Sequence, residues 1–239
     1  MPAAVGIVLA ALGLAGCGPV PATQGIQDPY EEANRNTHQL NLGIDKYVIR
    51  PLARGAGHII PEPVFQGVSN FAGNLDLPGT AVNDVLQLKL DQAANNTLRF
   101  AVNSTIGIAG LFDPATAIGL PEMPTDFGQT LSVWGMGEGN YMELPFVGPS
   151  TERDALGKVV DYALDPTRLF VPRNKNWIVT AAHLGAKIGD RSRYSETVDS
   201  ILYESADSYA QARLIYLEHR RHDLGQTTAA SEFEDPYAK

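Results

Sequence analysis

Cysteine is almost absent from this sequence of 239 residues, in which Cys17 is the single example. One thiol cannot form an intramolecular disulfide, and one cysteine is too few for a cysteine-based zinc site. Charge is also absent around it, because residues 1–27 contain no Asp, Glu, Lys or Arg. The sequence therefore excludes a disulfide-stabilised fold, and it raises the question of what an uncharged N-terminal segment with one cysteine does.

A short apolar segment precedes that cysteine. Residues 3–16 are apolar or small throughout, which is about the length of a secretory signal core and too short to span a hydrocarbon layer ~30 Å thick. The run LAGC at residues 14–17 resembles a bacterial lipobox, in which the cysteine sulfur receives a diacylglycerol. We predict a signal peptide over residues 1–16, lipid attachment at Cys17 and a linker over residues 17–27. The alternative, a buried N-terminal helix, would require a cap and an amphipathic pattern that this segment lacks.

Long hydrophobic runs are absent from the rest of the chain. No later window reaches the ~18 consecutive apolar residues of a membrane-spanning helix, so a multi-span membrane protein is excluded. The net charge of −9 leaves little basic surface to neutralise phosphates, which argues against nucleic acid as a partner. It also argues against electrostatic docking on an anionic bilayer, so any membrane contact must be mainly apolar.

Helical periodicity dominates the chain after residue 27. The run DPYE predicts a helix start, with Asp28 as the N-cap and Pro29 at the first helical position. Apolar residues then recur at spacings of three and four up to Val48, and Pro51 is expected to end this helix. Similar apolar stripes follow over residues 64–71, 86–106 and 194–216.

These patterns predict a mostly α-helical fold made of a single domain over residues 28–223. Alternating strand patterns are scarce. The remaining residues 224–239 are polar and acidic, and we expect them to form a disordered tail.

Basic side chains are absent from residues 100–150, where all charged residues are acidic. Uncharged runs of 13 and 11 residues in this stretch are too short to cross a bilayer as helices. Composition alone leaves open whether they dip into one leaflet or belong to the core. Amphipathic aromatic side chains are favoured at the membrane–water interface. We take Trp134, Tyr141 and Met142 as candidate membrane-interface residues.

Catalytic and metal-binding motifs are scarce. Of five histidines only His219 and His222 lie close together, and with Asp223 they lack the further ligands that zinc requires. No serine lies in a G-x-S-x-G elbow. The glycine-rich run GMGEGN at residues 135–140 is not a dinucleotide-binding fingerprint, because Pro145 follows where a helix would be needed. We predict neither catalysis nor a metal site.

Four sequence blocks in fixed order resemble the VacJ/MlaA lipoprotein family, and the resemblance runs from Asp28 to about Asp223. The blocks are DPYEEANRNTHQLNLGIDKYVIRPLA, VSNFAGNLDLPGTAVNDVLQ, RFAVNSTIGIAGLFDPA and DFGQTLSVWGMGEGNYMELPFVGPSTERDALG.

The resemblance implies a ring of short and medium amphipathic helices that lies in the membrane interface around an amphipathic channel. It implies an outer-membrane lipoprotein, anchored on the periplasmic face by the diacylglycerol and N-acyl lipid of Cys17, with no other cofactor. Such a protein removes mislocalised phospholipid from the outer leaflet. Its implied partners are phospholipid, an outer-membrane porin trimer and the periplasmic lipid carrier MlaC.

In such a channel, the loop with Gly135, Gly137 and Gly139 is our candidate gate element. A fixed tight turn is the equally open alternative, because glycine permits both a bent and a left-handed backbone. Two other functions also stay open: a lipoprotein phospholipase or esterase, which would need a nucleophile, a base and an oxyanion hole within reach of one another, and a structural lipoprotein that braces porins.

Overall fold

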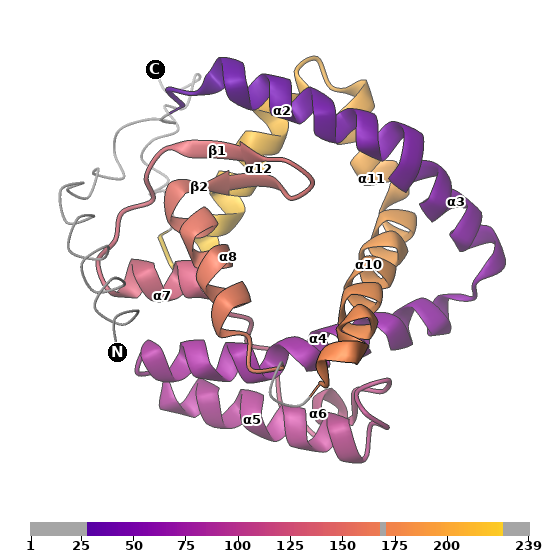
Figure 1. The fold of residues 1–239 in the computed structure, drawn as a ribbon, viewed down its shortest axis with the longest axis vertical. Coiled ribbons are helices and arrows are strands. Elements are labelled where there is room, and N and C mark those ends of the chain that lie inside the picture. Colours follow the sequence, from indigo (N-terminus) through magenta and orange to yellow (C-terminus); the bar gives the residue numbers. More distant parts are fainter. Residues whose placement is uncertain (1–27, 168–170, 227–239) are drawn as a thin grey trace, which may run out of the picture.

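The computed structural model describes residues 28–167 and 171–226, and helices form most of this part of the chain. The helices follow one another around a ring with a central opening (Figure 1). The predicted mostly α-helical domain is confirmed, whereas the signal peptide, Cys17, the linker and residues 227–239 lie outside the described residues.

In chain order the elements are α2 (Glu31–Ile44), η1 (Asp45–Ile49), α3 (Arg50–Ile59), α4 (Glu62–Leu86), α5 (Leu90–Thr105), α6 (Pro114–Ala117), α7 (Phe127–Val133), β1 (Tyr141–Leu144), β2 (Gly148–Thr151), α8 (Glu152–Leu164), η2 (Arg173–Lys175), α10 (Asn176–Arg193), α11 (Ser195–Asp199), η3 (Ser200–Glu204) and α12 (Ser208–Asp223).

One continuous helical arc runs from α2 through η1 into α3. The expectation that Pro51 ends the first helix is therefore wrong. The segment η1 is a π-helical turn, and Pro51 falls just after it, in the first turn of α3. A proline is tolerated in a first turn, where its missing N–H has no intrahelical partner to lose, and the π-turn supplies the break in the hydrogen-bond pattern.

The start of α2 also differs from the prediction. The N-cap position is Tyr30, and no side chain caps the helix. Asp28 instead accepts hydrogen bonds from the Tyr209 hydroxyl and the Arg213 guanidinium of α12. Arg35 of α2 adds an ion pair with the residue that precedes α12. Contacts between the first and last described helices thus close the ring.

The long helix α4 packs against α5 on one side and α10 on the other. In Figure 1, α5 lies outside α4, and the ends of α8 and α10 meet α4 on either side of the opening. A small residue permits the approach of α10, because a Cβ at Gly189 would lie 2.8 Å from Cδ1 of Phe65. Where α4 borders the opening, the wall of the ring is therefore two helices thick.

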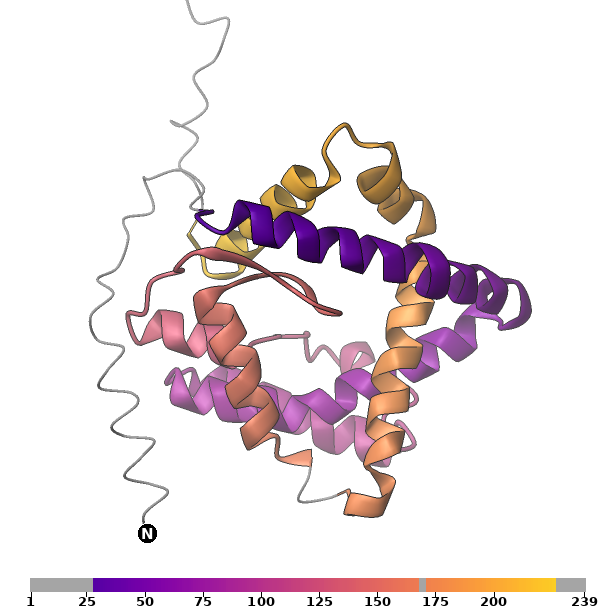
Figure 2. The same ribbon diagram turned by 45° about the horizontal axis from the view of Figure 1, so that its top comes forward.

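A β-hairpin interrupts the helices, although the sequence shows no clear strand pattern. Strands β1 and β2 pair antiparallel, with Tyr141 opposite Thr151 and Leu144 opposite Gly148. Figures 1 and 2 show the hairpin beside α2, with the turn of residues 145–147 directed toward the opening. The hairpin is the element that reaches furthest into the ring.

Polar side chains make up much of the buried interior of the described ring, and many large apolar side chains are exposed. Ile59, Leu90 and Phe112 are 83%, 64% and 61% exposed. A wall one or two helices thick has little interior to bury such side chains, so they remain on its surfaces. Among the described helices, none has the length and hydrophobicity needed to cross a membrane.

Candidate functional site

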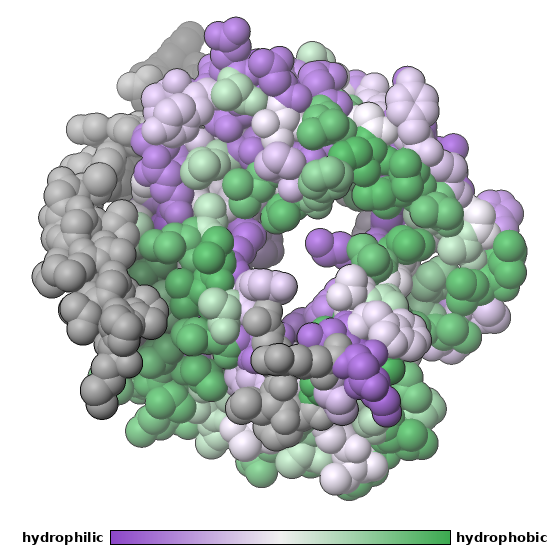
Figure 3. All heavy atoms as spheres, in the orientation of Figure 1, coloured by the Kyte–Doolittle hydropathy of each residue, from purple (hydrophilic) through white to green (hydrophobic). Residues whose placement is uncertain are grey.

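The central opening is the most prominent functional feature of the ring. Figure 3 shows that it persists when all heavy atoms are drawn as spheres, with hydrophobic and hydrophilic residues both at its border. Helices α2, α4, α8 and α10 and the β-hairpin surround it (Figures 1 and 2). An opening with both characters suits a molecule that has a polar and an apolar part.

The hairpin turn that points to this opening carries two apolar side chains. Phe146 and Val147 are 76% and 53% exposed, and Phe146 adopts the left-handed backbone with φ of 65°. Asn41 of α2 holds the turn at two points: its Oδ1 accepts the Phe146 N–H at 2.8 Å, and its amide nitrogen donates to the Leu144 carbonyl at 3.0 Å. The turn is thus anchored at its base by one polar side chain and exposed at its tip.

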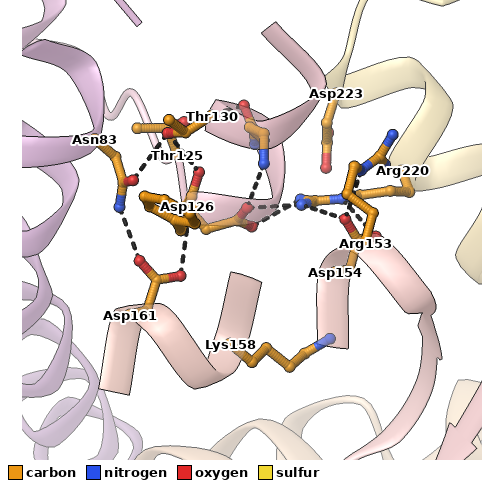
Figure 4. Close-up of polar contacts among 12 residues, drawn as sticks. Asn83, Thr125, Asp126, Thr130, Arg153, Asp154, Lys158, Asp161, Arg220 and Asp223 are labelled. Carbon is orange, nitrogen blue, oxygen red and sulfur yellow. Dashed lines mark hydrogen bonds and ion pairs between the residues drawn. The ribbon is translucent and has the colours of Figure 1, made fainter. Parts of the chain in front are cut away.

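An arginine–carboxylate cluster fixes the ring wall where α7, α8 and α12 meet (Figure 4). Arg220 of α12 binds the Asp126 carboxylate at 2.7 and 2.8 Å and the Asp154 carboxylate at 3.0 Å. The Tyr216 hydroxyl donates to Asp154 at 2.7 Å. We call Arg220, Asp126 and Asp154 the Arg220 cluster.

Both carboxylates of the Arg220 cluster also lie at helix starts. Asp126 is the N-cap of α7 and accepts the Gln129 N–H at 2.8 Å, while Thr151 caps α8 by accepting the Asp154 N–H at 3.2 Å. Anionic side chains are favoured at these positions by the helix dipole. Burial raises the pKa of Asp154, but the charges of Arg220 and Arg153 outweigh it and lower the pKa below the usual range. Asp154 therefore stays ionised inside the wall.

Two glycines allow α7 and α8 to cross beside the Arg220 cluster. A Cβ on Gly157 would lie 2.4 Å from the backbone nitrogen of Gly128 and 2.7 Å from its Cα. A Cβ on Gly128 would lie 2.6 Å from both Arg220 Nη2 and Asp154 Oδ1. The crossing has no room for a side chain at either position.

A second buried polar cluster joins α2, the hairpin and α12. His38, which is 3% exposed, contacts Ser208 Oγ through Nε2 at 3.1 Å and Glu143 Oε1 through Nδ1 at 3.4 Å. The Tyr141 hydroxyl donates to Glu143 at 2.6 Å, and its ring packs edge-on against Tyr209. Ser208, His38 and Glu143 are therefore linked in the serine–histidine–acid arrangement of a catalytic triad. The sequence did not indicate this arrangement.

The glycine loop is held by its neighbours. Gly135 and Gly139 have φ of 92° and 73°, and a Cβ on Gly139 would lie 2.8 Å from Glu152. Glu152 also accepts hydrogen bonds from the backbone and side-chain nitrogens of Asn140. Figure 1 shows the segment between α7 and β1 along the outer side of the ring. These contacts favour the fixed turn, and the gate role of Gly135, Gly137 and Gly139 stays a prediction.

The three candidate membrane-interface residues differ in exposure. Trp134 is 57% exposed, and its Nε1–H donates to the Leu86 carbonyl at 3.1 Å. Met142 is half-buried. Tyr141 is only 1% exposed, so its assignment to the membrane interface is wrong. Its hydroxyl is satisfied inside the wall by Glu143, and it therefore needs no contact with the wet edge of a membrane.

Comparisons with known proteins agree with this architecture. The sequence model of the family described as "MlaA lipoprotein" matches residues 26–223. An uncharacterized protein of Rickettsia felis is 37% identical over 189 residues, covering 79% of this chain and 74% of its own. The Escherichia coli (strain K12) "Intermembrane phospholipid transport system lipoprotein MlaA" is 33% identical over 208 residues, covering 84% and 79%. A solved structure described as "Structural basis for maintenance of bacterial outer membrane lipid asymmetry" superposes with a TM-score of 0.72 at 29% identity, covering 82% of this chain and 98% of that one.

Proposed function

This chain belongs to the MlaA lipoprotein family, and from that premise we propose that it removes mislocalised phospholipids from the outer leaflet of the outer membrane. It works in intermembrane phospholipid transport and thereby maintains outer-membrane lipid asymmetry. The observation that carries the proposal is the opening through the ring, which both hydrophobic and hydrophilic residues border (Figure 3). A phospholipid has a polar headgroup and apolar chains, so its path must offer surfaces of both kinds.

The exposed apolar surface supports a position in the membrane interface. Side chains such as Ile106, Ile108 and Phe112, in the segment that follows α5, are 72%, 61% and 61% exposed. Interfacial elements bury such faces ~5–10 Å deep without crossing the bilayer. The diacylglycerol and N-acyl lipid on Cys17 anchor the ring on the periplasmic face, and Trp134 lies at the edge of the membrane.

Two protein partners complete the proposed route. A porin trimer holds the ring in the outer membrane, and the soluble carrier MlaC receives the lipid in the periplasm. Both follow from the family resemblance. Transfer in this proposal is passive: the lipid enters the opening, passes the gate and moves down an affinity gradient to the carrier.

The gate element in this proposal is the glycine loop of Gly135, Gly137 and Gly139, which lies directly before the hairpin. We expect Gly137→Val to slow phospholipid removal, because a β-branched side chain restricts the backbone that precedes β1. Surface phospholipid in cells expressing each variant measures the effect, and Gly55→Val, at an exposed position of α3 with nothing within 4 Å, is the control. Normal removal by a folded Gly137→Val chain would show that the loop is a fixed turn.

A hydrolase is the second candidate, because Ser208, His38 and Glu143 are aligned. The N–H groups beside Ser208, however, are not free to form an oxyanion hole. The Asp207 carboxylate accepts the Ala210 N–H at 3.1 Å, and hydrogen bonds from Arg35 and from that N–H lower the pKa of Asp207 to about 2. An ionised carboxylate at this place would destabilise a developing oxyanion. We assign the cluster a structural role, in joining α2 to α12.

Deletion of the chain tests the proposed function. We expect phospholipid to accumulate on the cell surface of the deletion strain, and the wild-type chain to restore asymmetry. Cys17→Ala should fail to restore it, since the ring would lose its anchor. Normal asymmetry in the deletion strain, together with porin binding by the wild-type chain, would favour the structural porin brace instead.

A further inference from the structure

The turn of the β-hairpin, residues 145–147, presents apolar side chains where the ring is open. Figures 1 and 2 show this turn directed toward the opening. The side chains of Phe146 and Val147 are both exposed there, so they add little buried apolar area to the fold. Their placement calls for a reason other than stability.

The backbone of Phe146 has a conformation that a bulky residue rarely adopts. Its φ of 65° lies in the left-handed region, where the Cβ atom approaches the following carbonyl oxygen. Glycine adopts this conformation without strain, as Gly148 does nearby with φ of 93°. An aromatic ring that is both strained and exposed stabilises neither the turn nor the core. Strained residues of this kind are typical of positions that contact a ligand.

Two asparagines of α2 hold the hairpin in place. In the described part of the chain β1 pairs with β2 alone, so the backbone groups on its other edge need partners from elsewhere. Asn34 Oδ1 accepts the Glu143 N–H at 2.9 Å, and its amide nitrogen donates to the Tyr141 carbonyl at 3.2 Å. Asn41 lies two helical turns further along α2 and accepts the Phe146 N–H at 2.8 Å. The turn is therefore fixed to α2.

The backbone of residues 145–147 offers no free N–H group to a lipid phosphate. Pro145 has no N–H. The Phe146 N–H is bonded to Asn41, and the Val147 N–H donates to a backbone carbonyl at 3.3 Å. None of the three side chains is charged. Because anionic headgroups are bound through N–H donors and positive charge, the turn fits the hydrocarbon part of a lipid.

We propose that Phe146 contacts the acyl chains of the phospholipid in the opening, and that Asn41 is the positioning residue that holds Phe146 there. The inference rests on the proposed function and specifies a lipid-contact residue of that route. An aromatic ring gives a large apolar contact area at a low cost in conformational entropy, and an acyl chain requires no hydrogen bond from it.

A photoreactive residue tests the contact in cells that express the full-length lipoprotein. p-Benzoylphenylalanine in place of Phe146 reacts with C–H groups on irradiation, and mass spectrometry of the purified chain detects the adduct and locates its bond. We expect an intact phospholipid attached through an acyl chain. Asn41→Ala should reduce this adduct by about fivefold, because the turn loses two hydrogen bonds to α2.

The matched control places the same photoreactive residue at Ile59. This residue is exposed and ends α3, away from the hairpin (Figure 1). Its adducts with membrane lipid should not change in the Asn41→Ala chain.

Two substitutions separate the contact from folding. Phe146→Gly should slow the removal of surface phospholipid by about fivefold, which corresponds to the loss of one apolar contact. Its thermal unfolding midpoint should nevertheless be at least as high as that of the wild type, because glycine relieves the left-handed backbone. Phe146→Leu keeps an apolar side chain and should retain most of the removal.

Three results would overturn the inference and leave the proposed function intact, provided that the wild-type chain removes surface phospholipid. They are the absence of an acyl-chain adduct at position 146, an unchanged adduct in Asn41→Ala, and normal removal by Phe146→Gly. A wild-type chain that removes no surface phospholipid would contradict the proposed function, and the inference with it.

Discussion

Arg220→Met lowers the free energy of unfolding by about 3 kcal/mol or more, because removing one partner of a buried ion pair leaves its counter-charge unpaired. The Asp154 side chain is only 3% exposed and would lose two hydrogen bonds from the guanidinium. Asp126 would lose its contact with α12 at the same time. The result is a loosened junction of α7, α8 and α12 (Figure 4).

Chemical denaturation followed by circular dichroism measures this loss. Arg193→Met is the control, since Arg193 pairs with Glu62 at the surface and its removal should cost about 1 kcal/mol or less. Equal losses in the two variants would show that the Arg220 cluster contributes no more than a surface ion pair.

Gly157→Val is expected to have the second large effect. Its Cβ would overlap the backbone of Gly128, at 2.4 Å from the nitrogen, and backbone in a helix cannot rotate away as a flexible side chain can. Relief requires α7 and α8 to separate, which pulls Asp126 away from Arg220. Overpacking of this kind costs about 1–3 kcal/mol and occasionally more, and we expect the upper end because the ion pairs are strained as well.

Thermal unfolding compares this variant with Gly55→Ala, for which the expected sign is opposite. Gly55 is exposed within α3, and a Cβ at this position would have no neighbour within 4 Å, so alanine should raise stability by about 0.5–1 kcal/mol through helix propensity. A Gly157→Val chain as stable as the wild type would contradict the close crossing of α7 and α8.

Apolar spacing predicts the stretches that hold α2, α4, α5 and α12, because it reports one face of a helix, but it does not predict α8 or α10. The sequence does not predict the start of α2, since Asp28 has the features of an N-cap but its carboxylate binds Tyr209 and Arg213 from the far end of the chain. Nor does it predict that the helix continues past Pro51, because the π-turn η1 that precedes this residue has no simple sequence signature.

The polar clusters escape prediction from the sequence for a related reason. Arg220 lies in the basic end of the last helix, where charge is expected to be solvated, and only the fold brings it to Asp126 and Asp154. His38 likewise meets Glu143 and Ser208 from distant segments. Ring closure depends on pairs separated by most of the chain, and local patterns carry no information about such pairs.

The fate of a phospholipid labelled on both its headgroup and an acyl chain tests the central claim most directly. This doubly labelled phospholipid is inserted into the outer leaflet of cells that contain or lack the chain. We predict that both labels leave the outer leaflet together, as intact phospholipid, only when the chain is present. Free fatty acid released only when the chain is present, or removal that does not depend on the chain, would contradict a ring that transports intact phospholipid.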